Sequence, residues 1–150
     1  MMLEIKVLKK NSVATLKEVN RLMSQMSLSA VPPKAISAKD FREILSQKNL
    51  SFLIAEAKIA GSKKVVGILS LYFVRLPSGL IAVIEDLVVD HPYRLLGVAP
   101  LLVKQAIAMA VARRARHISL RTNPQRAEAN KLYQSMGFQK RETNFYRINL

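Results

Sequence analysis

The fold is decided by residues 80–114, LIAVIEDLVVDHPYRLLGVAPLLVKQAIAMAVARR. Residues 80–89 are rich in apolar and β-branched side chains and predict a strand, whereas the apolar spacing from about Pro100 to Arg114 predicts a helix. The loop between them contains Gly97, where the backbone can approach a ligand closely, and then the small Ala99. A helix N-terminus leaves N–H groups unpaired and carries partial positive charge, so this pattern fits a pyrophosphate site, although a glycine there is also ordinary turn chemistry.

The chain before this stretch predicts one strand, two helices and two further strands. Residues 3–7 alternate apolar and polar side chains, which is typical of a strand. Helical spacing follows over residues 16–26 after a cap at Asn11 or Ser12, and a break is expected at Val31-Pro32-Pro33. Ser37 can cap a second, short helix through Leu45. Strands are predicted at 51–57 and 65–74, and short turns join these two and the strand at 80–89 into an antiparallel meander.

The chain after this stretch predicts a strand at 117–120 and a helix from Asn123-Pro124 to Met136, which Gly137 ends. Phe138 onward and residues 145–150 predict a final hairpin. The order of elements indicates a mixed α/β layer fold, with one domain over residues 1–150 and a mostly antiparallel central sheet flanked by helices.

Composition narrows the class of protein. The chain has no cysteine, which excludes a disulfide scaffold, a thiolate metal site and a cysteine nucleophile, and its two histidines are too few to predict a metal site. We expect a cytoplasmic protein with no membrane contact, because charges interrupt any apolar signal core and no stretch is long enough to span a bilayer.

The net charge is +14, and residues 91–150 carry eleven basic and two acidic side chains, which is +9 of that total. Such an excess indicates an acidic partner: a polyanionic small molecule, nucleic acid or a membrane surface. RNA or the ribosome stays an alternative partner, although the sequence shows no RNA-binding motif.

A second motif gives the strongest signal. Residues 129–138 read Ala-Asn-Lys-Leu-Tyr-Gln-Ser-Met-Gly-Phe, and residues 94–99 read Arg-Leu-Leu-Gly-Val-Ala. Together they resemble the GCN5-related N-acetyltransferase (GNAT) family, whose signatures are Gln/Arg-x-x-Gly-x-Gly/Ala and a later Ala-x-x-Leu-Tyr-x-x-x-Gly-Phe. The strand segment Ile84-Glu85-Asp86 is similar to a branch that includes glucosamine-6-phosphate acetyltransferases and small bacterial enzymes of unassigned substrate.

The resemblance implies a GNAT fold with a splayed strand pair at the cofactor site, and transfer of acetyl from acetyl-CoA to an amine by direct attack in a ternary complex. It places the thioester against backbone groups of Leu87, Val88 and Val89. It places the pyrophosphate against Arg94, Leu95, Leu96, Gly97, Val98 and Ala99. Leu95-Leu96 and Pro100 depart from the family pattern, because they remove positive charge and one N–H, and so predict weaker or rearranged pyrophosphate contacts.

The resemblance also assigns roles to side chains. Tyr133 matches the general acid, although a half-buried aromatic on a helix would look the same. Glu85 is the candidate base and Asp86 a candidate for holding the ammonium group, because a regular strand points one of them into the acceptor groove. A solvent-facing or salt-bridged carboxylate at Glu85 would look the same in the sequence. Asn130, one helical turn before Tyr133, is expected on the cofactor arm. Arg126 either reaches a phosphate or caps its helix.

The acceptor is expected to be a small-molecule amine, an amino sugar or a peptide amine, bound between the N-terminal helices, the strand at 80–89 and the final hairpin. GNAT proteins often dimerise, so a homodimer is an expected assembly. The alternative is a non-catalytic module that binds acyl-CoA or another acidic partner on the same fold.

Overall fold

The computed structural model describes residues 1–26 and 33–150. The first half of the chain forms β1 (Met2–Val7), α1 (Val13–Met23), α2 (Ala38–Ser46), β2 (Leu50–Ile59) and β3 (Ser62–Leu76). The second half forms β4 (Gly79–Val89), the short 3-10 helix η1 (His91–Tyr93), α3 (Val98–Ala112), β5 (Ile118–Ser119) and α4 (Ala127–Ser135). The predicted order of elements is confirmed as far as α4.

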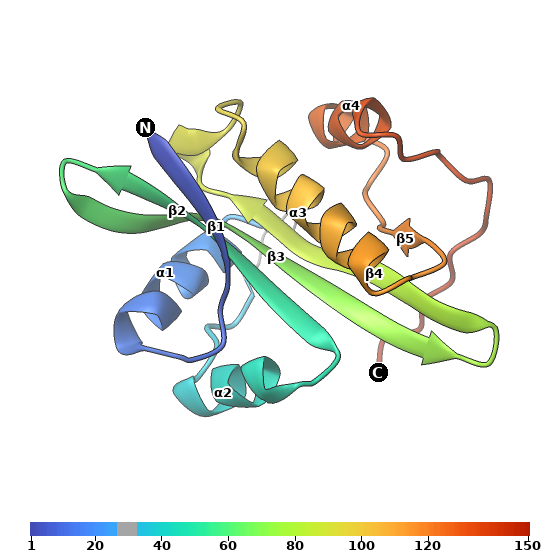
Figure 1. Ribbon diagram of the computed structural model, residues 1–150, viewed down its shortest axis with the longest axis horizontal. Coiled ribbons are helices and arrows are strands. Elements are labelled where there is room, and N and C mark those ends of the chain that lie inside the picture. Colours follow the sequence, from blue (N-terminus) through green and yellow to red (C-terminus); the bar gives the residue numbers. More distant parts are fainter. Residues whose placement is uncertain (27–32) are drawn as a thin grey trace.

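The strands form one twisted five-stranded sheet in the order β1-β2-β3-β4-β5, which Figure 1 shows nearly edge-on. Neighbouring strands from β1 to β4 run antiparallel, as the short turns predict, and β5 pairs with β4 in parallel. The sheet is therefore mostly antiparallel, and the chain folds as a single α/β domain of the predicted class.

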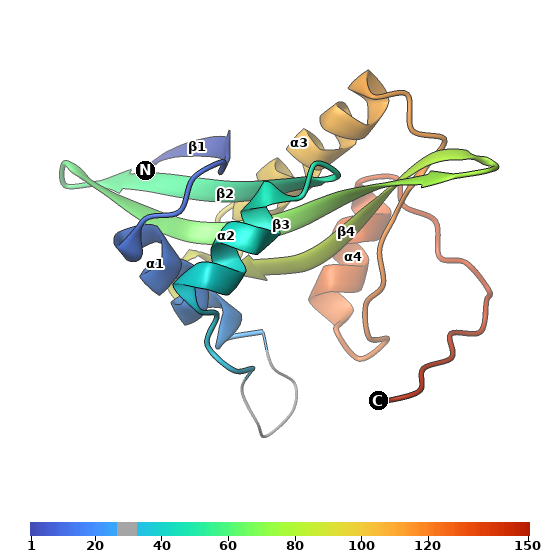
Figure 2. The same ribbon diagram turned by 90° about the horizontal axis from the view of Figure 1, so that it is seen from below.

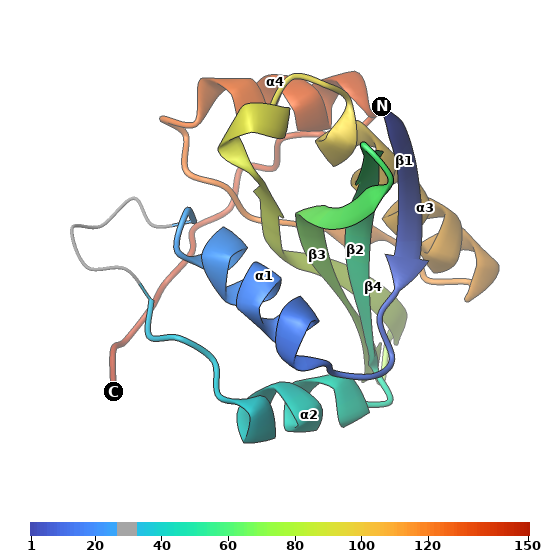
Figure 3. The same ribbon diagram turned by 90° about the vertical axis from the view of Figure 1, so that its left-hand side faces the viewer.

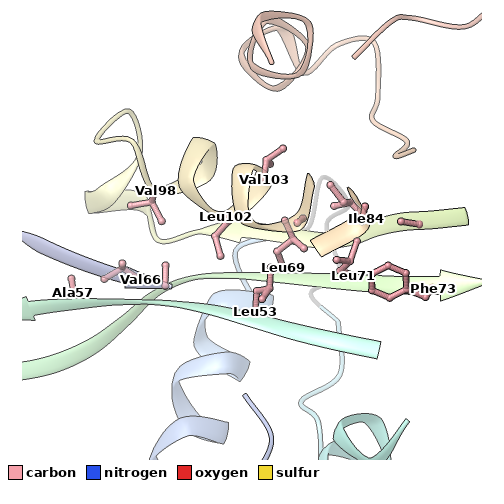
Figure 4. Close-up of a cluster of buried hydrophobic side chains, with 14 residues drawn as sticks. Leu53, Ala57, Val66, Leu69, Leu71, Phe73, Ile84, Val98, Leu102 and Val103 are labelled. Atoms are coloured by element: carbon pink, nitrogen blue, oxygen red, sulfur yellow. The ribbon is translucent and has the colours of Figure 1, made fainter. Parts of the chain in front are cut away.

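Helices α1 and α2 cover one face of this sheet and α3 covers the other (Figures 2 and 3), and an apolar core lies between the sheet and the helices on each face. The period-2 alternation of β2 divides its side chains between them, because Leu53 and Ala55 face α3 while Phe52 and Ile54 face α1 and α2. The core under α3 is drawn in Figure 4, where Val98, Leu102 and Val103 lie over the strands. The sheet is thus covered by helices on both faces.

The structure differs from the sequence-based boundaries in several places, and α4 begins at Ala127 rather than at Asn123-Pro124. Helix α1 ends at Met23 rather than near Met26, and α3 begins at Val98 rather than Pro100, because Gly97 caps it in a left-handed conformation. Of the predicted strand at 117–120, only Ile118 and Ser119 pair with β4. The predicted break at Val31-Pro32-Pro33 falls largely on residues that the structure does not describe.

The predicted final hairpin is wrong, because residues 138–150 form no strand in the structure. Residues 145–150 keep an alternating pattern, but a strand needs a partner edge as well as a pattern, and this segment has none. Its large side chains are exposed instead, namely Phe145, Tyr146, Ile148 and Leu150. Among the helices described, none is long and apolar enough to cross a bilayer.

Candidate active site

Strands β4 and β5 separate soon after they meet. They pair only at Ala82–Ile118 and Val83–Ser119, so residues 84–89 of β4 have no β5 neighbour anywhere in the part of the chain described. At the far end of β4 the Asp90 N–H donates to the Val66 carbonyl at 2.9 Å. The N–H and carbonyl of Val89 therefore face away from β3, toward the side that β5 has left. The backbone groups of Val89 therefore lie on this free edge, whereas Val88, the residue before it, directs its own toward Ile68 of β3.

A register shift in β4 interrupts the strand beside this free edge. Ile68 of β3 pairs with Val88, but Ser70 pairs with Glu85, so β4 carries one residue more than its partner across this interval. Asp86 lies in this bulge with a φ of 50°, a left-handed conformation that aspartate tolerates better than most residues. Strict alternation therefore fails at Glu85 and Asp86, and the sequence argument that they point to opposite faces does not apply.

The loop after β4 forms a turn that leads into α3. Leu95 and Gly97 both have positive φ, 61° and 85°, and α3 then begins at Val98. The Leu101 N–H makes a long bond, 3.3 Å, to the Gly97 carbonyl, and Pro100 has no N–H, so the amides of Val98 and Ala99 are the free donors at this helix end. These amides and an open space beside Gly97 suit a pyrophosphate.

The side chains of this loop supply little to an anion. Leu95 and Leu96 are 86% and 54% exposed. Arg94 turns back toward the strand, where its Nε donates to the Val89 carbonyl at 3.1 Å. The guanidinium of Arg94 thus contacts the free edge of β4. The sequence does not predict this contact, because the family resemblance places Arg94 only near the phosphates.

Tyr133 lies half-buried on α4, and its ring packs edge-on against Phe138 with the centroids 5.9 Å apart. Leu87, Val89 and Tyr133 all pack against the core under α3, so the structure brings the predicted acid and the end of β4 onto one cluster. Burial raises the pKa of the Tyr133 hydroxyl, and the positive charge of Arg126 lowers it in part. A neutral, proton-bearing phenol is the form that a general acid requires.

Asn130 makes local contacts in this structure. Its Nδ2 donates to the carbonyl of Arg126 at 2.8 Å and to that of Asn123 at 3.1 Å. These bonds close the loop that leads into α4, where Arg126 is the N-cap residue and makes no side-chain capping bond. The amide nitrogen of Asn130 is therefore engaged by the backbone, which leaves its oxygen for other contacts.

Two carboxylates at the bulge differ in their surroundings. Burial, and then the nearby charge of Glu85, raise the pKa of Asp86 above its ordinary value. Glu85 is more open to solvent, and its Oε1 lies 3.2 Å from Nη2 of Arg121. The Arg121 guanidinium lies in turn 4.3 Å from the centre of the Phe145 ring. The sequence carries no signal for this contact, because its members lie on β4, after β5 and near the C-terminus.

A second group of charges was also missed from the sequence. Asp90, at the end of β4, is 2% exposed and lies 2.7 Å from Arg21 Nη1 and 3.2 Å from Lys64 Nζ. Gln25 completes the group, because its Nε2 donates to Asp90 at 2.9 Å while its Oε1 accepts from the His91 N–H. The end of α1 is thereby tied to the end of β4, next to the loop that precedes α3.

Comparison with known proteins assigns this arrangement to a family. The model of the acetyltransferase (GNAT) family matches residues 16–138, which include the bulge, the loop and α4. The chain belongs to the GNAT acetyltransferase family. This membership makes it an N-acetyltransferase whose acetyl donor is acetyl-CoA, as the two sequence motifs predict.

Solved structures share the GNAT fold over nearly the whole chain. An acetyltransferase from Trypanosoma brucei is 20% identical, with a TM-score of 0.78 over 99% of this chain and 100% of that one. The aminoglycoside acetyltransferase AAC(6′)-Iy, bound to a bisubstrate analogue, is 22% identical, with a TM-score of 0.78 over 100% of both chains. The glucosamine-6-phosphate N-acetyltransferase of Arabidopsis thaliana is 16% identical, with a TM-score of 0.75 over 99% of both. A search of curated protein sequences finds no match to this GNAT chain.

Proposed function

We propose that this GNAT enzyme acetylates a primary amine, carried by a small molecule, an amino sugar or a peptide, through direct attack on acetyl-CoA in a ternary complex. The observation that carries the proposal is the separation of β4 from β5 beside a bulge that holds two carboxylates. Aminoglycoside and amino-sugar acetyltransferases share the fold, which supports an amine acceptor.

Acetyl-CoA supplies an activated thioester, and this chain supplies groups to bind it. The backbone from Arg94 to Ala99, with its two positive φ values, binds the pyrophosphate chiefly through the free amides of the first turn of α3. The segment Leu87, Val88 and Val89, beside the free edge of β4, holds the acyl arm and stabilises the oxygen on which negative charge develops. Asn130 contributes its side-chain oxygen to the same arm.

The protons balance as follows. The acceptor arrives as an ammonium ion, and Asp86 holds it while Glu85 takes one proton, directly or through water, and releases it to solvent. The neutral nitrogen then attacks the carbonyl carbon, so an N–C bond forms and the C–S bond breaks. Tyr133 protonates the departing thiolate, and the second nitrogen proton then restores the Tyr133 hydroxyl, so the products are an amide, free thiol and the one proton already released to solvent.

An amine-panel assay with thiol detection and mass readout of the product tests this function. We expect thiol release from acetyl-CoA only when an amine is present. Tyr133→Phe should lower kcat by about 10²–10⁴-fold, the usual contribution of a general acid, with acetyl-CoA affinity unchanged in calorimetry. Tyr146→Phe, which alters an exposed tyrosine in the C-terminal segment, is the matched control.

Two results would contradict the proposal. Acetyl-CoA binding without thiol release for any amine would indicate the non-catalytic binding module. If no acetyl-CoA bound at high micromolar concentration, the loop before α3 would not be a pyrophosphate site.

A further inference from the structure

We infer that the acceptor carries a carboxylate or phosphate close to its amine, and that Arg121 selects it. This inference rests on the proposed function, because it assigns the substrate class of the same site. The observation behind it is the contact that joins Glu85, Arg121 and Phe145.

Three separate segments meet at this contact. Glu85 lies at the register shift of β4, Arg121 follows β5 by two residues, and Phe145 belongs to the C-terminal segment. The Arg121 guanidinium lies 4.3 Å from the centre of the Phe145 ring, and that of Arg147 lies 5.9 Å from the same ring. Arg121 therefore lies against the carboxylate of Glu85, the proposed base. Arg147 lies near Phe145, the ring that also contacts Arg121.

These charges disfavour a purely cationic acceptor. The Glu85 carboxylate is already paired with Arg121, and burial raises the pKa of Asp86, which weakens it as an anion. Arg121 and Arg147 repel a second positive charge at short range, and the chain as a whole carries +14. A polycationic acceptor would have to separate Glu85 from Arg121, and it would gain little binding energy because Arg121 and Arg147 repel it.

An acceptor with both charges would replace both halves of the pair. Its ammonium group would take the place of the guanidinium at Glu85, and its carboxylate or phosphate would take the place of Glu85 at Arg121. The planar fork of arginine binds such oxygens through two parallel hydrogen bonds, and the Phe145 ring, whose centre lies 4.3 Å from the guanidinium, supports the fork beside Glu85. The pair is open to exchange, because the side chains of Arg121 and Glu85 are 61% and 42% exposed.

Matched acceptors test this inference. Amino acids are compared with their amides, and phosphoethanolamine with ethanolamine, so that each pair differs in one acidic group. We expect kcat/KM to be about tenfold or more higher for the acidic member, as for one charged hydrogen-bonded contact. The two arms separate carboxylate from phosphate, and a polycationic aminoglycoside should react more slowly than either acidic acceptor.

Variants then test Arg121 itself. Arg121→Gln should raise KM for acidic acceptors about tenfold and remove the preference for them over their neutral partners. Arg121→Lys should restore part of it, because the charge returns without the fork. Arg75→Gln is the matched control, since Arg75 is an exposed arginine that pairs with Leu80 at the opposite end of β4. Thermal unfolding and acetyl-CoA affinity confirm that each variant is folded.

The failures of the two proposals are distinguishable. If acetyl-CoA binds and no amine of any class is acetylated, the proposed function fails and this inference fails with it. If amines are acetylated but neutral or polycationic ones react faster, only the substrate class is overturned. A preference for acidic acceptors that survives Arg121→Gln would overturn the role of Arg121.

Discussion

At the residue scale, the buried carboxylate of Asp90 has the most charged neighbours in the site region. Burial alone would raise its pKa, but hydrogen bonds from Gln25, Arg21 and Lys64 outweigh burial and lower it. A pKa below that of the unfolded chain means that the ionised carboxylate stabilises the fold. This contribution is present above the unfolded pKa of about 3.9 and is lost as the pH falls through the folded pKa.

Asp90→Asn should therefore lower the free energy of unfolding by roughly 1.5–3 kcal/mol at neutral pH, the range for hydrogen bonds to a charged group. The difference from wild type should shrink as the pH falls from about 4 through the lower folded pKa, because the wild-type carboxylate is then protonated as well. Urea unfolding at both pH values measures it. Glu43→Gln, on the exposed face of α2, should change stability by about 0.5 kcal/mol or less. An equal loss at both pH values would contradict the ionic account.

Asp86 in the β4 bulge is the opposite case. Burial, and then the charge of Glu85, raise its pKa, so ionisation of Asp86 destabilises the fold as the pH rises from the unfolded pKa through the folded one. Asp86→Asn should raise Tm at neutral pH, and this gain should decrease below about pH 4. Any benefit of asparagine in the left-handed conformation is independent of pH and cancels in the comparison. If the gain in Tm from Asp86→Asn grew toward acidic pH, the direction assigned to the pKa shift of Asp86 would be wrong.

At the element scale, the site depends on how closely α3 approaches the sheet. Gly67 of β3 lies under this helix, and a Cβ there would come within 2.8 Å of Val98 Cγ1 and 3.0 Å of Leu102 Cδ1. Val98 is also the first residue of α3, where the free amides lie. Packing at Gly67 therefore positions the loop that we assign to the pyrophosphate.

Gly67→Ala should destabilise the protein by about 1–3 kcal/mol, as overpacking of a well-filled core does. It should also weaken acetyl-CoA binding, because the first turn of α3 must move. Val98→Ala removes the nearest atom, so the double variant should lose less than the two single variants together, with a coupling of about 0.5–3 kcal/mol. Urea titration measures the loss of stability, and calorimetry measures acetyl-CoA binding. Strict additivity would mean that α3 accommodates the added methyl group without involving Val98.

At the scale of the whole molecule, the charge of +14 acts on every anionic ligand. The loop side chains offer little charge of their own, since Arg94 bonds to the strand and the two residues after it are leucines. Attraction of acetyl-CoA must then come mainly from the summed field of the protein, which salt screens over about 10 Å at ~0.1 M.

We expect the association rate constant of acetyl-CoA to fall about tenfold or more when salt rises from ~50 mM to ~0.5 M. Acetyl-pantetheine, which lacks the phosphates, is the matched control and should show little change. Stopped-flow binding measures both rates. If acetyl-CoA and acetyl-pantetheine showed equal salt dependence, the effect would come from a change in the protein's stability and not from electrostatic steering of the phosphates.

Much of this molecule was predictable from local patterns. Periodicity and caps predict nine of the ten elements from β1 to α4, all except the short 3-10 helix η1. The hydrophobic period of a strand or helix can be recognised within a few residues. Gly97 and the motif ending in Gly137-Phe138 lead to the family for the same reason, because a turn or a helix end requires particular residues at fixed local spacing.

Only the tertiary structure decided which distant groups meet. The bulge at Asp86 depends on the register with β3, and the unpaired segment at 145–150 depends on whether an edge receives it. Asp90 meets Arg21, 69 residues earlier, and Glu85 meets Arg121, 36 residues later. A sequence pattern records the needs of each segment, whereas these contacts follow from how the packed layers bring segments together. The family and its cofactor therefore came from the sequence, and the substrate inference came from the folded chain.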